Sequence, residues 1–203
     1  MALPVRRGVL WGLLVVCLLG VVAAALVRLR RPEPPPVLGE VPDFTLINRD
    51  GRTIRRADLA GSAWIADFIF TRCPASCPIM TARLARLNGE LPRGSEVRLV
   101  SFSVDPEHDT PEVLERYAQS FKAPARWLFL TGAGPQIYRL SREGFKLGVD
   151  ASPQGNGAET AEPILHSTRF VLVDGEGRIR GYYDAFDAES MKRLVRDLAA
   201  ISQ

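Results

Sequence analysis

AWIADFIFTRCPASCP, residues 63–78, is the stretch that decides the fold of this chain. Its first eight residues are almost wholly apolar, which is typical of a strand buried on both faces of a sheet. Two cysteines four residues apart follow. Pro78 then stands where a helix can begin, because a first-turn residue needs no partner for its N–H. We therefore predict a strand over residues 63–70, a turn that holds two thiols, and a helix from Pro78 to Gly89.

The residues after Pro78 support this helix. Met80, Leu84, Leu87 and Leu91 recur at the spacing of a single helical face, so Met80 is expected in the core rather than as a sulfur ligand. The N-terminus of a helix carries partial positive charge, which favours the thiolate form of a nearby cysteine. Two thiols placed there suit a soft metal ion or a redox couple.

Length and cysteine content set the limits of the interpretation. The chain has 203 residues, enough for one well-buried domain with an appendage. It has three cysteines, of which Cys17 lies inside an apolar run and only Cys73 and Cys77 form a close pair. One pair in a chain of this size is not a disulfide framework, although a structural disulfide or two buried apolar cysteines remain alternatives to a metal or redox site.

The charge is unevenly distributed. The chain contains 26 Lys and Arg against 23 Asp and Glu, but five arginines fall within residues 1–37, which hold a single acidic residue, Glu33. The remainder therefore carries 21 basic and 22 acidic residues. A nucleic-acid-binding domain needs a basic face of its own, so no nucleic-acid partner is expected.

The apolar run predicts a membrane anchor. Gly8 to Val27 are 20 residues without a charge, which at about 1.5 Å per residue span a ~30 Å hydrocarbon core. We predict a short cytoplasmic tail (1–7), a single transmembrane helix (8–28) in the inner (cytoplasmic) membrane, a Pro-rich linker (29–39) and an extracytoplasmic domain (40–203). A signal peptide cleaved near Ala23–Ala25 is the alternative.

The order of predicted elements indicates an α/β fold. A β-hairpin around Gly51 comes first, followed by alternating strands and helices, a second hairpin at the turn 175–177 and a final helix. Alternation of this kind implies a sheet covered by helices on both faces, and a thiol pair after the first central strand makes it resemble the thioredoxin architecture. Residues 149–163 form a long polar loop, a length that usually has a functional reason.

The chain has two histidines that could complete a metal site. His166 follows the polar loop and precedes a strand expected beside the cysteine strand, so its imidazole could reach the turn. His108 lies among carboxylates and is more simply a solvated loop residue, and Asp105 is most simply a turn residue. A helix is predicted to start at residues 109–112, with Asp109 or Thr110 as its cap and Pro111 in its first turn. Two thiolates and one imidazole match the preference of Cu(I) for few, soft ligands.

Three motifs resemble the Sco/SenC family of copper chaperones over residues 40–200. They are DFIFTRCPxxCP (67–78), SVDPEHDTP (103–111) and HST…LVDxxG (166–177). The resemblance implies a membrane-tethered, thioredoxin-like protein that holds Cu(I), and also Cu(II), through Cys73, Cys77 and His166. It would deliver copper to the CuA site of cytochrome c oxidase subunit II or to another copper-accepting protein. Ala75 and Leu165 replace carboxylates that other members carry, which makes this site less anionic.

An assembly factor, rather than a turnover enzyme, is therefore the expected function. The alternative is a thiol–disulfide oxidoreductase that keeps the cysteines of a partner reduced, with Cys73 and Cys77 as the redox-active pair and no need for His166. A peroxidase is a distant third possibility. Such an enzyme usually needs one activated cysteine with a nearby arginine, and Arg72 is the one arginine that lies beside the pair in sequence.

Overall fold

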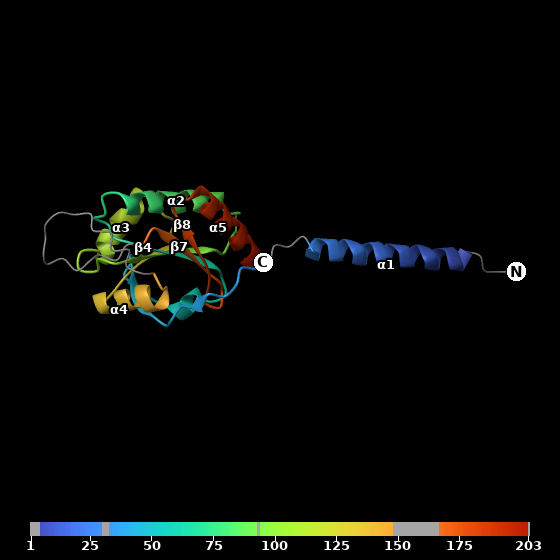
Figure 1. Ribbon diagram of the computed structural model, residues 1–203, viewed down its shortest axis with the longest axis horizontal. Coiled ribbons are helices and arrows are strands. Elements are labelled where there is room, and N and C mark those ends of the chain that lie inside the picture. The colour runs from blue at the N-terminus through green and yellow to red at the C-terminus, as the bar shows by residue number, and fades with distance from the viewer. Residues whose placement is uncertain (1–4, 30–32, 93, 148–166, 203) are drawn as a thin grey trace. The chain divides into compact units, whose positions relative to one another are not determined.

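The computed structural model describes residues 5–29, 33–92, 94–147 and 167–202 (Figure 1). The chain divides into two compact units, Met1–Glu33 and Pro34–Gln203. The described part of the first unit is dominated by helix α1 (Val5–Leu29). Within the described ranges, no helix has both the length and the apolar character that a membrane crossing requires.

The second unit is built on one eight-stranded sheet with the order β1-β8-β7-β4-β5-β6-β2-β3. The strands β4, β5 and β6 are parallel to one another, and the outer strands join them in antiparallel pairs. The strands are β1 (Gly39–Glu40), β2 (Thr45–Asn48), β3 (Thr53–Arg55), β4 (Trp64–Ile69), β5 (Arg98–Ser103), β6 (Trp127–Thr131), β7 (Arg169–Val173) and β8 (Arg178–Asp184). The mixed sheet confirms the predicted α/β class.

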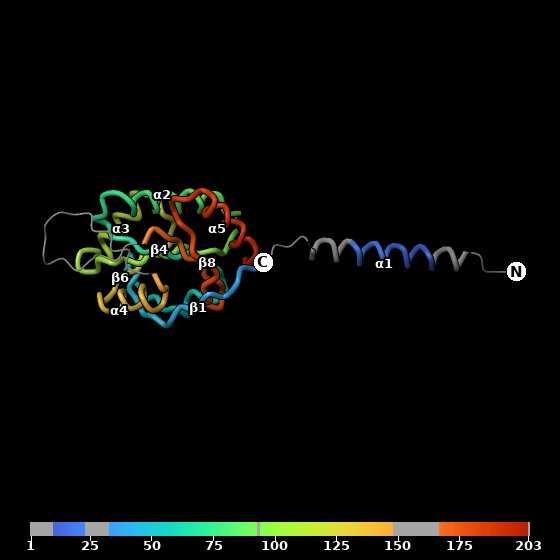
Figure 2. Tube along the Cα trace, in the orientation of Figure 1, coloured from blue at the N-terminus to red at the C-terminus, as the bar shows by residue number. Residues whose placement is uncertain are grey.

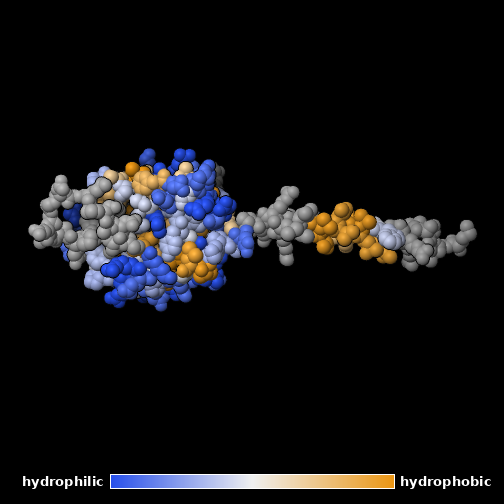
Figure 3. Space-filling view, in the orientation of Figure 1, coloured by the Kyte–Doolittle hydropathy of each residue, from blue (hydrophilic) through white to orange (hydrophobic). Residues whose placement is uncertain are grey.

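Helices cover both faces of this sheet (Figure 1). Helices α2 (Ser76–Glu90), α3 (Pro111–Ser120) and α5 (Ala188–Ile201) pack on one face, which we call the cysteine face because Cys73 and Cys77 belong to its core. The short helix η1 (Arg56–Leu59), helix α4 (Gly134–Arg139) and the π-helical turn η2 (Leu140–Gly144) cover the other, which we call the aromatic face. The surface that Figure 3 shows on this unit is largely hydrophilic.

Strand β4 lies at the centre of the domain (Figure 2). Every one of its six residues is buried, which explains its nearly continuous apolar sequence. Asp67 is the exception in that sequence, and it is fully inaccessible to solvent.

Three local predictions are confirmed. The hairpin β2–β3 turns through Gly51, whose φ of 79° is a left-handed conformation that glycine adopts without strain. Helix α3 starts after Thr110, whose hydroxyl accepts a hydrogen bond from the N–H of Val113 at 3.4 Å. In helix α2, the predicted inner residues Met80, Leu84 and Leu87 are buried.

The start of helix α2 differs from the prediction. It begins at Ser76, two residues before Pro78, so Cys77 belongs to the first helical turn instead of the preceding loop. Pro78 is still in that first turn, where a missing N–H costs no intrahelical hydrogen bond. The two thiols therefore differ in setting, since one lies in the turn and the other on the helix.

Candidate metal centre

The cysteine pair lies where β4 leads into α2. The chain leaves β4 at Ile69 and turns back through a hydrogen bond from the N–H of Cys73 to the carbonyl of Phe70 at 3.1 Å. Cys73 and Cys77 both carry free thiols, and their exposed fractions are 7% and 1%. The N–H of Cys77 donates to the sulfur of Cys73 at 3.4 Å, so the backbone of one cysteine directly stabilises the other.

Hydrogen bonding favours the thiolate of Cys73. Burial alone would raise the pKa of this thiol, but the Ser76 hydroxyl, 3.4 Å from its sulfur, and the N–H groups of Cys77 and Ala75 outweigh burial and lower the pKa. Cys73 is thus prepared to act as a nucleophile or as an anionic ligand.

Cys77 has the opposite character. Burial raises the pKa of its thiol strongly, and the neighbouring Cys73 and Asp67 raise it further. Cys77 therefore keeps its proton near neutral pH unless a metal ion, a new bond or a proton acceptor compensates for the loss. The sequence spacing of the pair gives no sign of this asymmetry.

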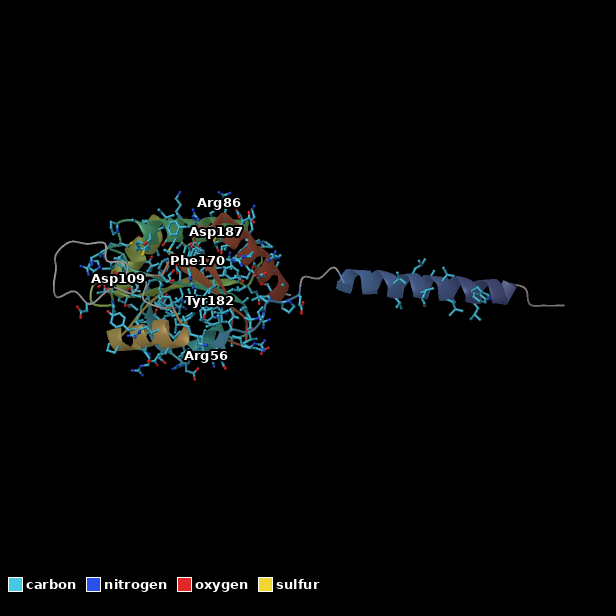
Figure 4. All side chains as sticks on the ribbon, in the orientation of Figure 1. Arg56, Arg86, Asp109, Phe170, Tyr182 and Asp187 are labelled. Carbon is cyan, nitrogen blue, oxygen red and sulfur yellow. The ribbon has the colours of Figure 1, made fainter. Side chains whose placement is uncertain are left out.

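A buried carboxylate braces the turn that presents the cysteines. Asp109 has no exposed surface, and its two oxygens accept hydrogen bonds from the N–H of Thr71 at 3.1 Å, from the Thr71 hydroxyl at 2.5 Å and from the Ser103 hydroxyl at 2.6 Å. Of the two predicted caps of this helix, Thr110 is the cap, and Asp109 instead fixes the backbone two residues before Cys73. Figure 4 labels Asp109 at the end of the domain where α3 begins.

Asp105 and His108 complete this brace. The guanidinium of Arg72 donates twice to Asp105, at 2.6 and 2.9 Å, and Nδ1 of His108 lies 3.0 Å from an oxygen of Asp109. Among the described residues, Asp105, His108 and Asp109 form a group whose ligand atoms all lie within 4.8 Å of one another. The oxygens of Asp105 and Asp109 already accept several strong hydrogen bonds, so we assign the group a structural role in holding the turn.

His166, the third predicted ligand, lies outside the described residues, as does the predicted loop 149–163. The described chain resumes just before β7, which pairs antiparallel with β4. Ala66 of β4 stands opposite Val171, so β7 begins at the end of the sheet where β4 leads into the cysteine turn. The two described residues that precede β7, Ser167 and Thr168, therefore lie toward the end of the sheet that holds the thiols.

The prediction did not include Asp67 among the functional candidates. Its side chain is buried on the cysteine face, and neither of its oxygens has a hydrogen-bond partner. An aspartate inside an otherwise apolar strand was the available signal, because a buried carboxylate without a partner is costly and needs an explanation.

Comparisons with known proteins agree with this architecture. The SCO1/SenC family model matches residues 35–203. The SCO1 protein homolog of Bacillus subtilis (strain 168) is 33% identical over 170 residues, which cover 82% of this chain and 85% of that protein.

Two solved structures extend the comparison. BsSco, a member of the Sco family of cytochrome c oxidase assembly proteins for which a disulfide switch is described, aligns with a TM-score of 0.68 and 31% identity, covering 85% of this chain and 98% of that one. ScoI of Arabidopsis thaliana, solved with copper bound, aligns with a TM-score of 0.63 and 27% identity, covering 79% and 98%.

Proposed function

Since the chain belongs to the SCO1/SenC family, we propose that it is a metallochaperone that binds copper and delivers it to the CuA site of cytochrome c oxidase, in subunit II or in another copper-accepting protein. The observation that carries this proposal is the pair of free thiols in one turn, linked by the hydrogen bond from the N–H of Cys77 to the Cys73 sulfur. Sulfur donors are the ligands that Cu(I) prefers.

The proposed ligands are Cys73, Cys77 and His166. Two observations support His166: β7, which follows it, pairs with the strand that leads to the cysteines, and a relative is solved with copper bound. Copper binding displaces the proton of Cys77 in particular, so affinity should fall as pH decreases. Transfer to the acceptor would proceed by exchange of one ligand at a time, which leaves the soft ion coordinated throughout.

Copper titration of the full chain tests this assignment, with the Cu(II)–thiolate charge-transfer absorption as a second readout. We expect one copper per chain, and a loss of affinity of at least about 100-fold in Cys73→Ala, in Cys77→Ala and in His166→Ala, because each change removes a ligand. Cys17→Ala is the matched control, since it removes a free thiol outside the turn and should leave binding unchanged. Stoichiometric binding by the Cys73→Ala, Cys77→Ala double variant would disprove the proposal.

We also propose that residues 8–28 attach the domain to the inner (cytoplasmic) membrane as a single-pass anchor, with the domain on the extracytoplasmic side. The uncharged run Gly8 to Val27 supports this proposal. The full chain should remain in the membrane pellet after an alkaline carbonate wash, whereas a chain without residues 1–37 should not. Release of the full chain by the wash would contradict the anchor.

A second candidate function is thiol–disulfide exchange with the cysteines of a copper acceptor. The opposite pKa shifts of the two thiols favour it, because exchange needs one thiol that attacks as a thiolate and a second thiol that stays protonated until the mixed disulfide has formed. His166→Ala separates the two functions: a variant that loses copper but still reduces a disulfide-bonded acceptor would support both roles. Loss of both activities would assign the cysteines to copper binding alone.

A further inference from the structure

Two large apolar side chains, Ile79 and Phe186, are exposed close to helix α2. Ile79 lies in α2 and is 45% exposed, and Phe186 lies in the loop between β8 and α5 and is 42% exposed. In the described part of the second unit, the other large apolar side chains that are exposed are Val37, Leu38 and Val195. A single exposed apolar residue is ordinary, but a group of them beside a reacting site indicates a contact surface.

A series of contacts links these side chains to Cys73. The Ser76 hydroxyl lies 3.4 Å from the Cys73 sulfur. Ser76, Ile79 and Arg83 occur at i, i+3 and i+7 of α2, which is the spacing of a single helical face. The guanidinium of Arg83 lies over the ring of Phe186, 5.3 Å from its centroid. Ile79, Arg83 and Phe186 therefore form one surface that begins beside Cys73, and we call it the docking surface.

The loop that carries Phe186 is held in place. Arg83 donates to the carbonyl of Ala185, and the N–H of Phe186 donates to the Asp184 carboxylate at 2.8 Å. The next residue, Asp187, caps helix α5. An aromatic ring whose position is already fixed loses little conformational freedom when a partner covers it. The exposed ring is therefore suited to binding another chain.

The charge of Arg83 is available to a partner. In the part of the chain that the structure describes, Arg83 forms no ion pair, whereas Arg86 on the same helix pairs with Glu90 at 2.9 Å. The acidic groups of the adjacent loop, Asp184 and Asp187, already accept hydrogen bonds from backbone N–H groups. An arginine that stacks on an aromatic ring can still bind a carboxylate, and both residue types are enriched at protein interfaces. The docking surface therefore fits a partner that offers an apolar side chain and a carboxylate.

The low exposure of the Cys73 sulfur requires a partner to cover its surroundings. Cys73 is 7% exposed, and the next two residues, Pro74 and Ala75, are exposed and uncharged. A protein sulfur can reach Cys73 only if its own chain lies against the turn and the start of α2. Ser76 and Arg83 are about 10 Å apart along the helix axis, and an extended chain advances about 3.3 Å per residue. Side chains two to four positions from the reacting cysteine of the partner therefore reach the docking surface.

We propose that the docking surface binds an extended, apolar and acidic segment of the partner protein, next to the cysteine that reacts or exchanges copper with Cys73. The inference rests on the proposed role of Cys73 and Cys77 as the reacting pair, and it adds the chemistry by which the partner is recognised. Ile79 and Phe186 bury an apolar side chain of the segment, and Arg83 pairs with its carboxylate. The docking surface raises the rate of productive encounters and leaves the reactivity of the sulfur unchanged.

Three synthetic peptides serve as probes. Each has one cysteine in a mixed disulfide with thionitrobenzoate, so attack by the Cys73 thiolate on the peptide sulfur forms a new disulfide and releases thionitrobenzoate, which is coloured. The first peptide carries a leucine two positions and an aspartate four positions after its cysteine. The second has serine in place of the leucine, and the third has asparagine in place of the aspartate. The protein is the reduced, metal-free full chain in a Cys17→Ser background, at one fixed pH.

We expect this protein to react with the first peptide at least about fivefold faster than with either of the others. Ile79→Ala and Phe186→Ala should each reduce the preference for leucine, and the variant with both changes should lose it. Val195→Ala is the matched control and should keep the full preference. That side chain is 46% exposed, but it lies in α5, nine positions along the chain from Phe186 and outside the docking surface.

Arg83 is tested with the second pair of peptides. Arg83→Gln should abolish the preference for aspartate over asparagine, and Arg83→Lys should keep most of it because the positive charge remains. Added salt should weaken the preference for aspartate and leave the preference for leucine. The small neutral reagent dipyridyl disulfide gives the reference reaction. All variants should react with it within about twofold of the parent rate, because it needs no contact with the docking surface.

Equal rates with the three peptides would overturn the proposal, and so would a preference for leucine that survives in the variant with both Ile79→Ala and Phe186→Ala. An equal loss of preference in Val195→Ala would also overturn it, because the effect would then not belong to the docking surface. Copper takes no part in these measurements. A failed copper titration would therefore disprove the proposed metallochaperone alone, whereas equal peptide rates with normal copper binding would disprove the docking surface alone.

Discussion

The two faces of the central sheet differ in a way that separates stability from chemistry. The aromatic face is packed by Phe44, Phe68, Phe102, Phe145 and Trp64, with ring centroids between 5.1 and 6.5 Å apart. The cysteine face is also buried, but it holds two thiols, an unpartnered carboxylate and several hydroxyls. The same strands supply both faces because neighbouring residues of a strand point to opposite sides.

This difference shows on which face the fold can hold buried polar groups that lower its stability. The aromatic face provides mainly apolar burial, which is the main source of stability. The cysteine face contributes less to the free energy of unfolding, because polar and ionisable groups are buried in it. Substitutions of core residues on the two faces should therefore change the free energy of unfolding in opposite directions. The three measurements below test this comparison between the faces.

The largest effect is expected on the aromatic face. Phe102 is fully buried and stacks on Phe68 at 5.1 Å, so Phe102→Ala should reduce the free energy of unfolding by about 3–5 kcal/mol in a urea titration. Phe186→Ala is the matched control, because that ring is 42% exposed and its loss should cost about 1 kcal/mol or less. Similar losses for the two variants would remove the contrast between core and surface rings.

Removing the charge of Asp67 should have the opposite sign. Its pKa is raised from 3.8 to about 7 by folding, so the folded chain holds this proton more tightly than the unfolded chain does. The favourable contribution is complete below the unfolded pKa and is lost as pH rises through about 7. The stability of Asp67→Asn relative to the parent should therefore grow by about 2–3 kcal/mol between pH 5 and pH 8.

Urea unfolding at the two pH values measures this change. Thr131→Ala is the control, since it alters a buried polar residue without removing an ionisable group or a hydroxyl that acts on Asp67, and it should give an offset that does not depend on pH. An equally constant offset for Asp67→Asn would show that Asp67 does not titrate in this range.

The smallest effect concerns the tuning of Cys73. The Ser76 hydroxyl helps to lower the pKa of this thiol, so Ser76→Ala should move the pH midpoint of its alkylation by iodoacetamide upward. Mass spectrometry of the labelled peptides separates Cys73 from Cys77, which should remain slow in both proteins. A midpoint that stays in place would assign the tuning to the backbone N–H groups alone.

Much of the fold could be predicted because its signals are local. The apolar run of β4, the periodic residues of α2, the glycine of the β2–β3 hairpin and the threonine cap of α3 each depend on a few neighbouring residues. The start of α2 was missed by two residues, since proline is allowed anywhere in the first turn and does not mark its first residue. The ligand role of His166 stays a prediction.

The sequence by itself therefore determined the order of strands and helices, the place of the thiol pair at a helix start and the family to which the chain belongs, because these follow from short-range pattern. Only the tertiary structure decided what each group in the site does. Asp109 meets Thr71 across 38 positions of sequence, and Asp67 and Cys77 owe their altered acidity to elements packed over them from elsewhere in the chain. Acidity in a protein depends on the loss of water and on nearby charges, and both are fixed when distant segments pack together.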